Sequence, residues 1–228
     1  AARQRGRARY SNIDLMKQYD YVGLKTFIKQ RNIMDFNLLF NVFPKKIYPF
    51  DYQTYFNSPE RFIMVTSNCL TGEAVYLEEK QDEKRVLDIC VATCSLPLLC
   101  PIAYVDGIPM VDGGVCDALP IRKSEADGNS RNVIVLTRNK GYRKPVKQQK
   151  LPGFVFRKYP ELRRELMLRY QRYNETIEYI EQLEADGKAL VIRPIRDVVV
   201  DRIERDVDKL TSFYEEGYAC AKAAFEKK

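Results

Sequence analysis

The stretch that decides the fold runs from Val91 to Ile121 and reads VATCSLPLLCPIAYVDGIPMVDGGVCDALPI. Its first residues end an amphipathic pattern over 82–94 that predicts a helix, and the proline that follows stops this helix. The dipeptide Asp106-Gly107 then joins two short apolar runs, which is the strongest local signal for a β-hairpin in the chain. The stretch therefore predicts a helix followed by a hairpin whose second strand ends at an Asp-Gly-Gly turn.

Outward from this stretch, the chain alternates helical and strand patterns. The run VIVL within 131–137 has no polar interruption, which predicts a strand covered on both faces in a parallel or mixed sheet flanked by helices. The alternating order predicts a single α/β domain. The other expected elements are two short helices between residues 21 and 43 stopped by Pro44, a hairpin of 61–66 and 73–77 around Thr71-Gly72, a helix from 162 to about 187, a strand over 190–193 and a last helix over 201–225.

Composition excludes several kinds of site. The 228 residues contain no histidine, which excludes a Ser-His-Asp or Cys-His centre and a histidine-ligated metal. Proton transfer must then use carboxylates, Lys, Tyr or Cys. The formal net charge of +7 is modest for a nucleic-acid-binding protein. The six cysteines lack the paired spacing of a zinc site or a disulfide framework, so we interpret most of them as buried reduced thiols, which favours the cytoplasm.

No segment predicts a membrane span, because the longest uncharged run, 89–105, is short and contains two prolines. At the N-terminus, the arginines of 3–9 form a basic arm that we interpret as solvated. Six basic residues on or before the long helix could meet anionic lipid head groups, although such a run is more often a solvated face. They are Arg157, Lys158, Arg163, Arg164, Arg169 and Arg172.

The quoted stretch resembles the second signature block of the patatin-like lipid acyl hydrolases. In that family a helix ending in small residues and Pro leads to a hairpin and then to an Asp-Gly-Gly turn, whose aspartate pairs with a serine as a catalytic dyad. The resemblance implies that Asp112 is the catalytic base and that Gly113 and Gly114 are the motif turn. The D-x-x-P-I element that follows in the family corresponds to Asp117, Pro120 and Ile121.

The resemblance also implies a fold. We expect an α/β, three-layer patatin-like sandwich with a mixed central sheet flanked by helices, followed by a helical C-terminal extension. Residues 1–228 would form a single patatin-like domain that is incomplete at its N-terminus. Within it, 1–140 would be the patatin-like core and 141–228 the mostly helical extension.

The physical reading of the motif agrees with this role. An aspartate at the end of a strand, followed by two residues without Cβ, lets the backbone turn sharply while the carboxylate projects beyond the sheet. Such a carboxylate can accept a proton from a serine hydroxyl, and a two-residue device of this kind fits a chain without histidine. An isolated Asp-Gly-Gly would be read as a simple turn; the surrounding block favours the catalytic interpretation for Asp112.

The nucleophile is not found in this chain. None of its seven serines lies in a G-x-S-x-G elbow, and the family's glycine-rich oxyanion loop is also missing. Both lie N-terminal to the Asp block in relatives, so we expect the serine upstream of Ala1; loss of catalysis is the alternative. Cys94 and Ser95 stand near the block, but without a recognisable base beside them we interpret them as a packed helix end.

The sequence thus predicts an acyl-ester hydrolase that acts on lipids, needs no metal or organic cofactor, and contacts an anionic membrane at most peripherally. Phospholipid, lysophospholipid, neutral glyceride and soluble ester all stay open as substrates, and so does the oligomeric state. The alternative is a non-catalytic basic module that binds an anionic membrane surface or nucleic acid. We favour the enzyme, with no nucleic-acid partner, because the module would not explain the block around Asp112.

Overall fold

The computed structural model of the protein describes residues 11–146, 151–197, 200–201 and 203–226, so the basic arm of 3–9 lies outside the described residues. The chain forms two compact units. The first comprises Ala1–Ala118 with Gln149–Arg169, and the second Leu119–Gln148 with Tyr170–Lys228. The expected division into a core and an extension at residue 140 stays a prediction.

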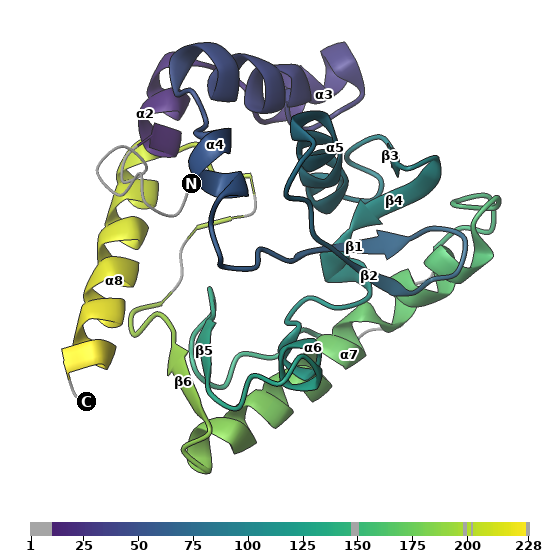
Figure 1. Cartoon of the computed structure of the whole chain (residues 1–228). Coiled ribbons are helices and arrows are strands. Elements are labelled where there is room, and N and C mark those ends of the chain that lie inside the picture. The colour runs from purple at the N-terminus through teal and green to yellow at the C-terminus, as the bar shows by residue number, and fades with distance from the viewer. Residues whose placement is uncertain (1–10, 147–150, 198–199, 202, 227–228) are drawn as a thin grey trace. The chain divides into compact units, whose positions relative to one another are not determined.

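The first unit is built on a four-stranded antiparallel sheet with the strand order β2-β1-β4-β3 (Figure 1). Both expected hairpins are confirmed: β1 pairs with β2, and β3 pairs with β4. Gly72, in the first turn, has φ +70°, the left-handed conformation that favours glycine. The strands are β1 (Met64–Asn68), β2 (Ala74–Leu77), β3 (Ala103–Val105) and β4 (Ile108–Asp112).

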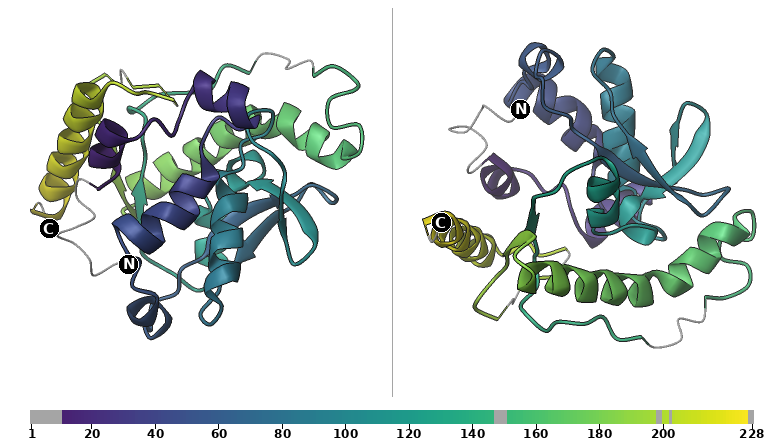
Figure 2. Two further views of the ribbon diagram at one scale, coloured as in Figure 1. Left: turned by 90° about the horizontal axis from the view of Figure 1, so that it is seen from above. Right: turned by 60° about the horizontal axis from the view of Figure 1, so that its bottom comes forward.

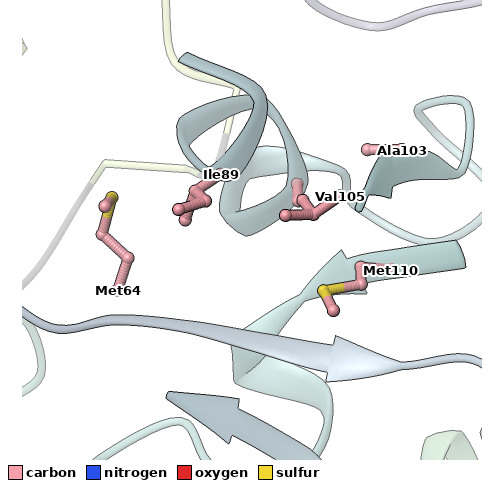
Figure 3. Close-up of a cluster of buried hydrophobic side chains, with 6 residues drawn as sticks. Met64, Ile89, Ala103, Val105 and Met110 are labelled. Carbon is pink, nitrogen blue, oxygen red and sulfur yellow. The ribbon is translucent and has the colours of Figure 1, made fainter. Parts of the chain in front are cut away.

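One face of this sheet is covered by α5 (Glu83–Cys94), the helix predicted over 82–94 (Figure 2). Asp82 caps the helix, because its carboxylate accepts hydrogen bonds from the backbone N–H groups of Lys84 and Arg85. The buried side chain of Ile89 points from the helix toward side chains of the strands, among them Met64 and Val105 (Figure 3). This apolar cluster fixes α5 on the sheet.

The opposite face is covered by the first part of α7 (Pro160–Ala185). Neighbouring residues of a strand point to opposite faces, and Met110 accordingly joins the cluster with α5 while Val111 joins a second buried cluster with Leu162 and Leu166 of α7. Helices therefore flank both faces of the sheet. The expected α/β class, with a flanked sheet and a helical C-terminal part, is confirmed.

Within the described residues, four helices precede β1, and one of them differs from the expectation at Pro44. The last expected helix before β1 was to stop at Pro44, but η1 runs through it to Ile47 with the bonding pattern of a π-helix, in which the N–H of Tyr48 donates to the carbonyl of Phe43. Phe43 is buried against Leu15 and Tyr21, and this packing overrides the local preference of proline to end a helix. The helices are α2 (Ser11–Gln18), α3 (Leu24–Gln30), η1 (Leu38–Ile47) and α4 (Tyr52–Phe56).

The second unit holds a two-stranded parallel sheet of β5 (Asn132–Val135) and β6 (Ala189–Ile192), together with α6 (Ile121–Ala126) and the remainder of α7. The parallel pairing agrees with the sequence, but the expectation that both faces of the VIVL strand are covered is wrong. Val133 and Val135 are 53% and 66% exposed. An apolar run alone does not show how many layers pack on a strand, and here Ile134 faces the core with Ile180 while the alternate residues face outward.

The last helix also begins later than expected, because α8 spans Val207–Glu226 rather than starting at residue 201. The carboxylate of Asp206 accepts hydrogen bonds from the N–H groups of Asp208 and Lys209, which caps the first turn at this position. Of the helices in the described part of the chain, none has both the length and the apolar character that crossing a membrane requires.

Candidate active site

Asp112 is the last residue of β4, the strand next to β1 in the middle of the four-stranded sheet, where it pairs with Thr66. Its backbone is held on both sides. The N–H of Asp112 donates to the carbonyl oxygen of Ser95, with an N···O distance of 3.0 Å, and its own carbonyl accepts from the hydroxyl of Ser67 at 2.9 Å. The half-buried aspartate is therefore fixed between the end of α5 and β1.

The carboxylate of Asp112 is oriented by the turn that follows it. Oδ1 accepts a hydrogen bond from the backbone N–H of Gly114, with an O···N distance of 2.6 Å. The residues Gly113–Val115 form a short 3-10 turn, η2, and Asp112 occupies its N-cap position. A cap of this kind fixes the direction of the carboxylate, which is what a positioned general base requires.

The two glycines of the motif are required by close contacts. A Cβ atom on Gly113 would lie 2.3 Å from the carbonyl oxygen of Val65 in β1, and one on Gly114 would lie 2.8 Å from Oδ1 of Asp112. Neither glycine has the positive φ that a sharp glycine turn would use. The role of Gly113 and Gly114 as the motif turn stays a prediction. The glycines are required here by close contacts, of Gly113 with the backbone of β1 and of Gly114 with the Asp112 carboxylate, rather than by backbone freedom.

Two serines support this turn. Ser95 belongs to the packed helix end that the sequence analysis expected, whereas no motif pointed to Ser67. The hydroxyl of Ser67 donates to the carbonyl of Asp112 and accepts from the N–H of Cys116 at 3.2 Å, so it bridges the two ends of the turn. The hydroxyl of Ser95 donates to the carbonyl of Val91 at 2.8 Å. Both serines are fully buried and both hydroxyls are used in these bonds, which makes them structural groups rather than nucleophiles.

Cys94 lies at the end of α5, where the negative charge of Asp112 affects its thiol. Burial, and next the negative charge of Asp112, raise the pKa of the Cys94 thiol to about 11. Burial likewise raises the pKa of Cys100. A thiol with such a pKa stays protonated near neutral pH and is a poor nucleophile. This supports the interpretation of Cys94 as part of a packed helix end.

The aspartate of the D-x-x-P-I element has a different environment. The phenol of Tyr76 in β2 donates to Oδ2 of Asp117 with an O···O distance of 2.6 Å. Burial, followed by this hydrogen bond, raises the pKa of Tyr76 well above its usual value, so the phenol keeps its proton. Pro120 precedes α6, and Ile121 is buried in the core of the second unit. These residues hold the chain beyond the turn.

The basic side chains within 157–172, which could meet lipid but were interpreted rather as a solvated face, do not form one uniform solvated face. Arg163 donates to the carbonyl of Leu151 with an N···O distance of 2.7 Å. Arg164 forms ion pairs with Glu161 at 3.0 Å and with the buried Glu165 at 3.3 Å. Contact of this helix with anionic lipid stays a prediction.

Two other features bear on ligands. The described residues contain no group of three or more His, Cys, Asp or Glu side chains placed to hold a metal ion. A cavity of about 970 Å³ in the first unit is lined mainly by residues of η1, α4, α5 and the segment 57–62, many of them aromatic or aliphatic, and Asp112 is not among them. The cavity is therefore separate from the Asp112 turn.

A comparison with known families shows which family contains the Asp112 turn. A model of the family Patatin-like phospholipase matches residues 3–123, which is more than half of the 228 residues and includes the whole Asp112 turn. The chain belongs to the patatin-like phospholipase family. A second family, described as a domain of unknown function (DUF6363), matches residues 159–227 of this patatin-like chain. No curated protein matches the chain significantly.

Membership of the patatin-like family confirms the resemblance derived from the Val91 to Ile121 stretch. It assigns the chain to a family of hydrolases that act on lipid acyl esters. The second match covers α7, β6 and α8, that is, most of the helical C-terminal part of this patatin-like chain. The role of Asp112 within the family's chemistry stays a prediction.

Proposed function

We propose that the protein hydrolyses an acyl ester of a lipid by a serine-aspartate dyad in which Asp112 is the general base. The observation that carries this proposal is the held carboxylate: Asp112 ends a central strand, its N–H and C=O are both hydrogen-bonded, and Gly114 orients its Oδ1. The match to the patatin-like phospholipase family supports the same reaction class. The serine belongs to a segment that lies outside these 228 residues.

In the first half of the reaction the serine oxygen attacks the carbonyl carbon of the ester, and its proton passes to the carboxylate of Asp112. Backbone amides stabilise the negative oxygen of the tetrahedral intermediate. When the bond between carbon and the leaving oxygen breaks, Asp112 returns the proton to that oxygen. An alcohol leaves, and the acyl group stays on the serine.

In the second half Asp112 takes a proton from water as the water oxygen attacks the acyl-serine. The serine oxygen then leaves with that proton, and a fatty acid is released. One carboxylate thus serves both halves. The fixed orientation of the Asp112 carboxylate stabilises the same geometry in both steps. Phospholipid, lysophospholipid and neutral glyceride differ in their head groups, and each fits this scheme.

The test is the substitution Asp112→Asn in the full-length gene product. Asn preserves the size and one acceptor oxygen of Asp but cannot take up a proton near neutral pH. A general base contributes about 10² to 10⁴ in rate, so hydrolysis of a p-nitrophenyl acyl ester should fall by about this factor. Circular dichroism should show that the fold is kept.

The matched control is Asp106→Asn, six positions earlier in the same hairpin. Asn-Gly forms this type of turn as well as Asp-Gly does, so activity should stay close to that of the wild type. Equal activity of both folded variants would refute the proposal and assign Asp112 to the turn alone. An inactive wild-type protein would favour loss of catalysis.

A further inference from the structure

The helix α3 presents an unusual combination of side chains to solvent. Leu24 and Ile28, one turn apart on the helix, are 68% and 74% exposed. Lys25 and Lys29 follow them at the same spacing and are exposed as well. Two aliphatic side chains beside two cations form the pattern of a helix that lies in a membrane interface.

The helix is held in place, so this exposure is a property of the fold rather than of a frayed end. Thr26, on the opposite side of α3, is buried. Before the helix, the N–H of Gly23 donates to the carbonyl of Ile33 at 2.9 Å, and after it the N–H of Arg31 donates to Phe27 at 2.8 Å. The exposed leucine and isoleucine are therefore presented on a fixed support.

This support is connected to the loop beside Asp112. The N–H of Ile33 donates to the carbonyl of Leu99 with an N···O distance of 2.8 Å, so residue 33 is hydrogen-bonded both to Gly23 before α3 and to the loop that follows α5. Leu98 in this loop is 56% exposed and has φ +71°, an uncommon conformation for a residue other than glycine.

Charge separates this surface from the exposed apolar residues of the two hairpins of the first unit. The segment from Tyr21 to Met34 contains three cations, Lys25, Lys29 and Arg31, and no acidic residue. By contrast, Leu70 is followed closely by Glu73, and the exposed residues of the β3–β4 hairpin flank Asp106. A cationic apolar surface complements a layer of anionic lipid, whose head groups are negative and whose acyl region is apolar.

We propose that α3, together with the loop over 96–100, is the surface by which this protein docks on an anionic lipid membrane. Leu24, Ile28 and Leu98 enter the boundary between head groups and acyl chains, while Lys25 and Lys29 contact the lipid phosphates. The loop over 96–100 begins directly after Ser95, whose carbonyl accepts the hydrogen bond from Asp112, so docking would bring the Asp112 turn to the membrane surface. The inference adds a route to the lipid substrate of the proposed function, but docking itself does not require hydrolysis.

The absence of tryptophan from the chain provides a direct test. In the variant Ile28→Trp the new residue is the sole tryptophan of these 228 residues, and its emission reports the polarity around position 28. Vesicles of phosphatidylcholine mixed with phosphatidylglycerol should shift this emission to shorter wavelength and protect it from acrylamide. Leu70→Trp is the matched control, since Leu70 is also exposed, at 56%, but lies in the β1–β2 turn; its emission should not change.

The contributions of charge and apolar area are separated by two further variants. Each lysine near an anionic membrane contributes about 1 kcal/mol, so Lys25→Gln with Lys29→Gln should weaken sedimentation with anionic vesicles about tenfold or more at low salt. Leu24→Ser with Ile28→Ser should weaken it by a similar factor, through loss of buried apolar area. The fold of each variant is checked by circular dichroism.

An emission of Ile28→Trp that anionic vesicles leave unchanged, or an equal shift of Leu70→Trp, would overturn the inference. A shift that depends on protein concentration without vesicles would also overturn it and assign the surface to contacts between copies of the chain. Asp112→Asn should bind vesicles as the wild type does. Failure of docking and failure of the proposed hydrolysis are therefore distinguishable.

Discussion

The hairpin of β3 and β4 contains two Asp-Gly dipeptides six residues apart, and the structure holds them in different ways. Asp106 and Gly107 both have positive φ, +53° and +78°, and nothing lies near the position of a Cβ on Gly107. The exposed carboxylate of Asp106 contacts the guanidinium of Arg85. At Asp112-Gly113 neither residue has positive φ, and the backbone is pressed against that of β1.

The difference shows that the dipeptide Asp-Gly can be required at a position for two different physical reasons. At 106–107 the sequence satisfies a local conformational preference, which any tight hairpin shares. At 112–113 it satisfies contacts with residues more than 40 positions earlier in the chain, chiefly Val65 and Ser67. We therefore expect the first pair to tolerate substitutions that keep the turn conformation, and the second pair to tolerate almost none.

The largest difference between the two pairs should appear when each glycine is replaced by alanine. Gly113→Ala places a Cβ 2.3 Å from the Val65 carbonyl, so the backbone of β1 or β4 must move, and we expect a loss of about 3 kcal/mol in the free energy of unfolding. Gly107→Ala has open space but must adopt φ near +78°, which costs about 1 to 2 kcal/mol. Urea denaturation followed by circular dichroism measures both values.

Equal losses for the two alanine variants would mean that the Asp112 turn relaxes more easily than its contacts indicate. A hydrolysis assay sharpens the same comparison, because a shift of the Gly113 backbone displaces the neighbouring carboxylate. Gly113→Ala should therefore lose activity beyond its loss of folded protein, whereas Gly107→Ala should not.

A smaller loss of stability is expected from replacing Ser67, whose hydroxyl is hydrogen-bonded to both ends of the Asp112 turn. Ser67→Ala leaves the carbonyl of Asp112 and the N–H of Cys116 without this partner in a buried position, which costs about 1 to 3 kcal/mol. Ser95→Ala is the matched control, since Ser95 is equally buried but its hydroxyl only returns to the preceding turn of α5. We expect its loss to stay below about 1 kcal/mol. If thermal and urea unfolding rank Ser95→Ala as the more damaging change, the Ser67 hydroxyl is not the main support of the turn.

Sequence reasoning found the features that rest on local rules. Asp82 at the start of α5, Gly72 in one turn and Asp106-Gly107 in the other each satisfy a short-range preference, and each element appears where it was expected. Asp112 could be identified as a candidate site residue from its place in the Asp-Gly-Gly motif. These signals need only a few neighbouring residues.

What the sequence could not supply depends on contacts between distant segments. The hydrogen bond from Ser67 to Asp112 exists only because β1 pairs with β4, and Ser67 lies 45 positions from Asp112. The passage of η1 through Pro44 depends on packing of Phe43 with Leu15. In the second unit, the uninterrupted apolar run of β5 does not reveal that Val133 faces outward. None of these follows from periodicity or propensity.

The smallest effect is expected from Asp106→Asn, which tests whether the outer Asp-Gly pair is held by local conformation alone. Asn keeps the positive φ of the turn, so the substitution removes only the exposed ion pair with Arg85, and Arg85 also contacts Glu79. The hydrogen bond from Arg85 lowers the pKa of Asp106 below its ordinary value of 3.8. A lowered pKa contributes stability that is present above the unfolded value and is lost as pH falls through the folded one. The wild type should thus be slightly more stable than Asp106→Asn near neutral pH, and the two urea midpoints should converge below about pH 4. A gap that widens in acid would show that the Asp106 carboxylate has another partner in the turn, and the outer pair would then depend on tertiary contacts as the inner pair does.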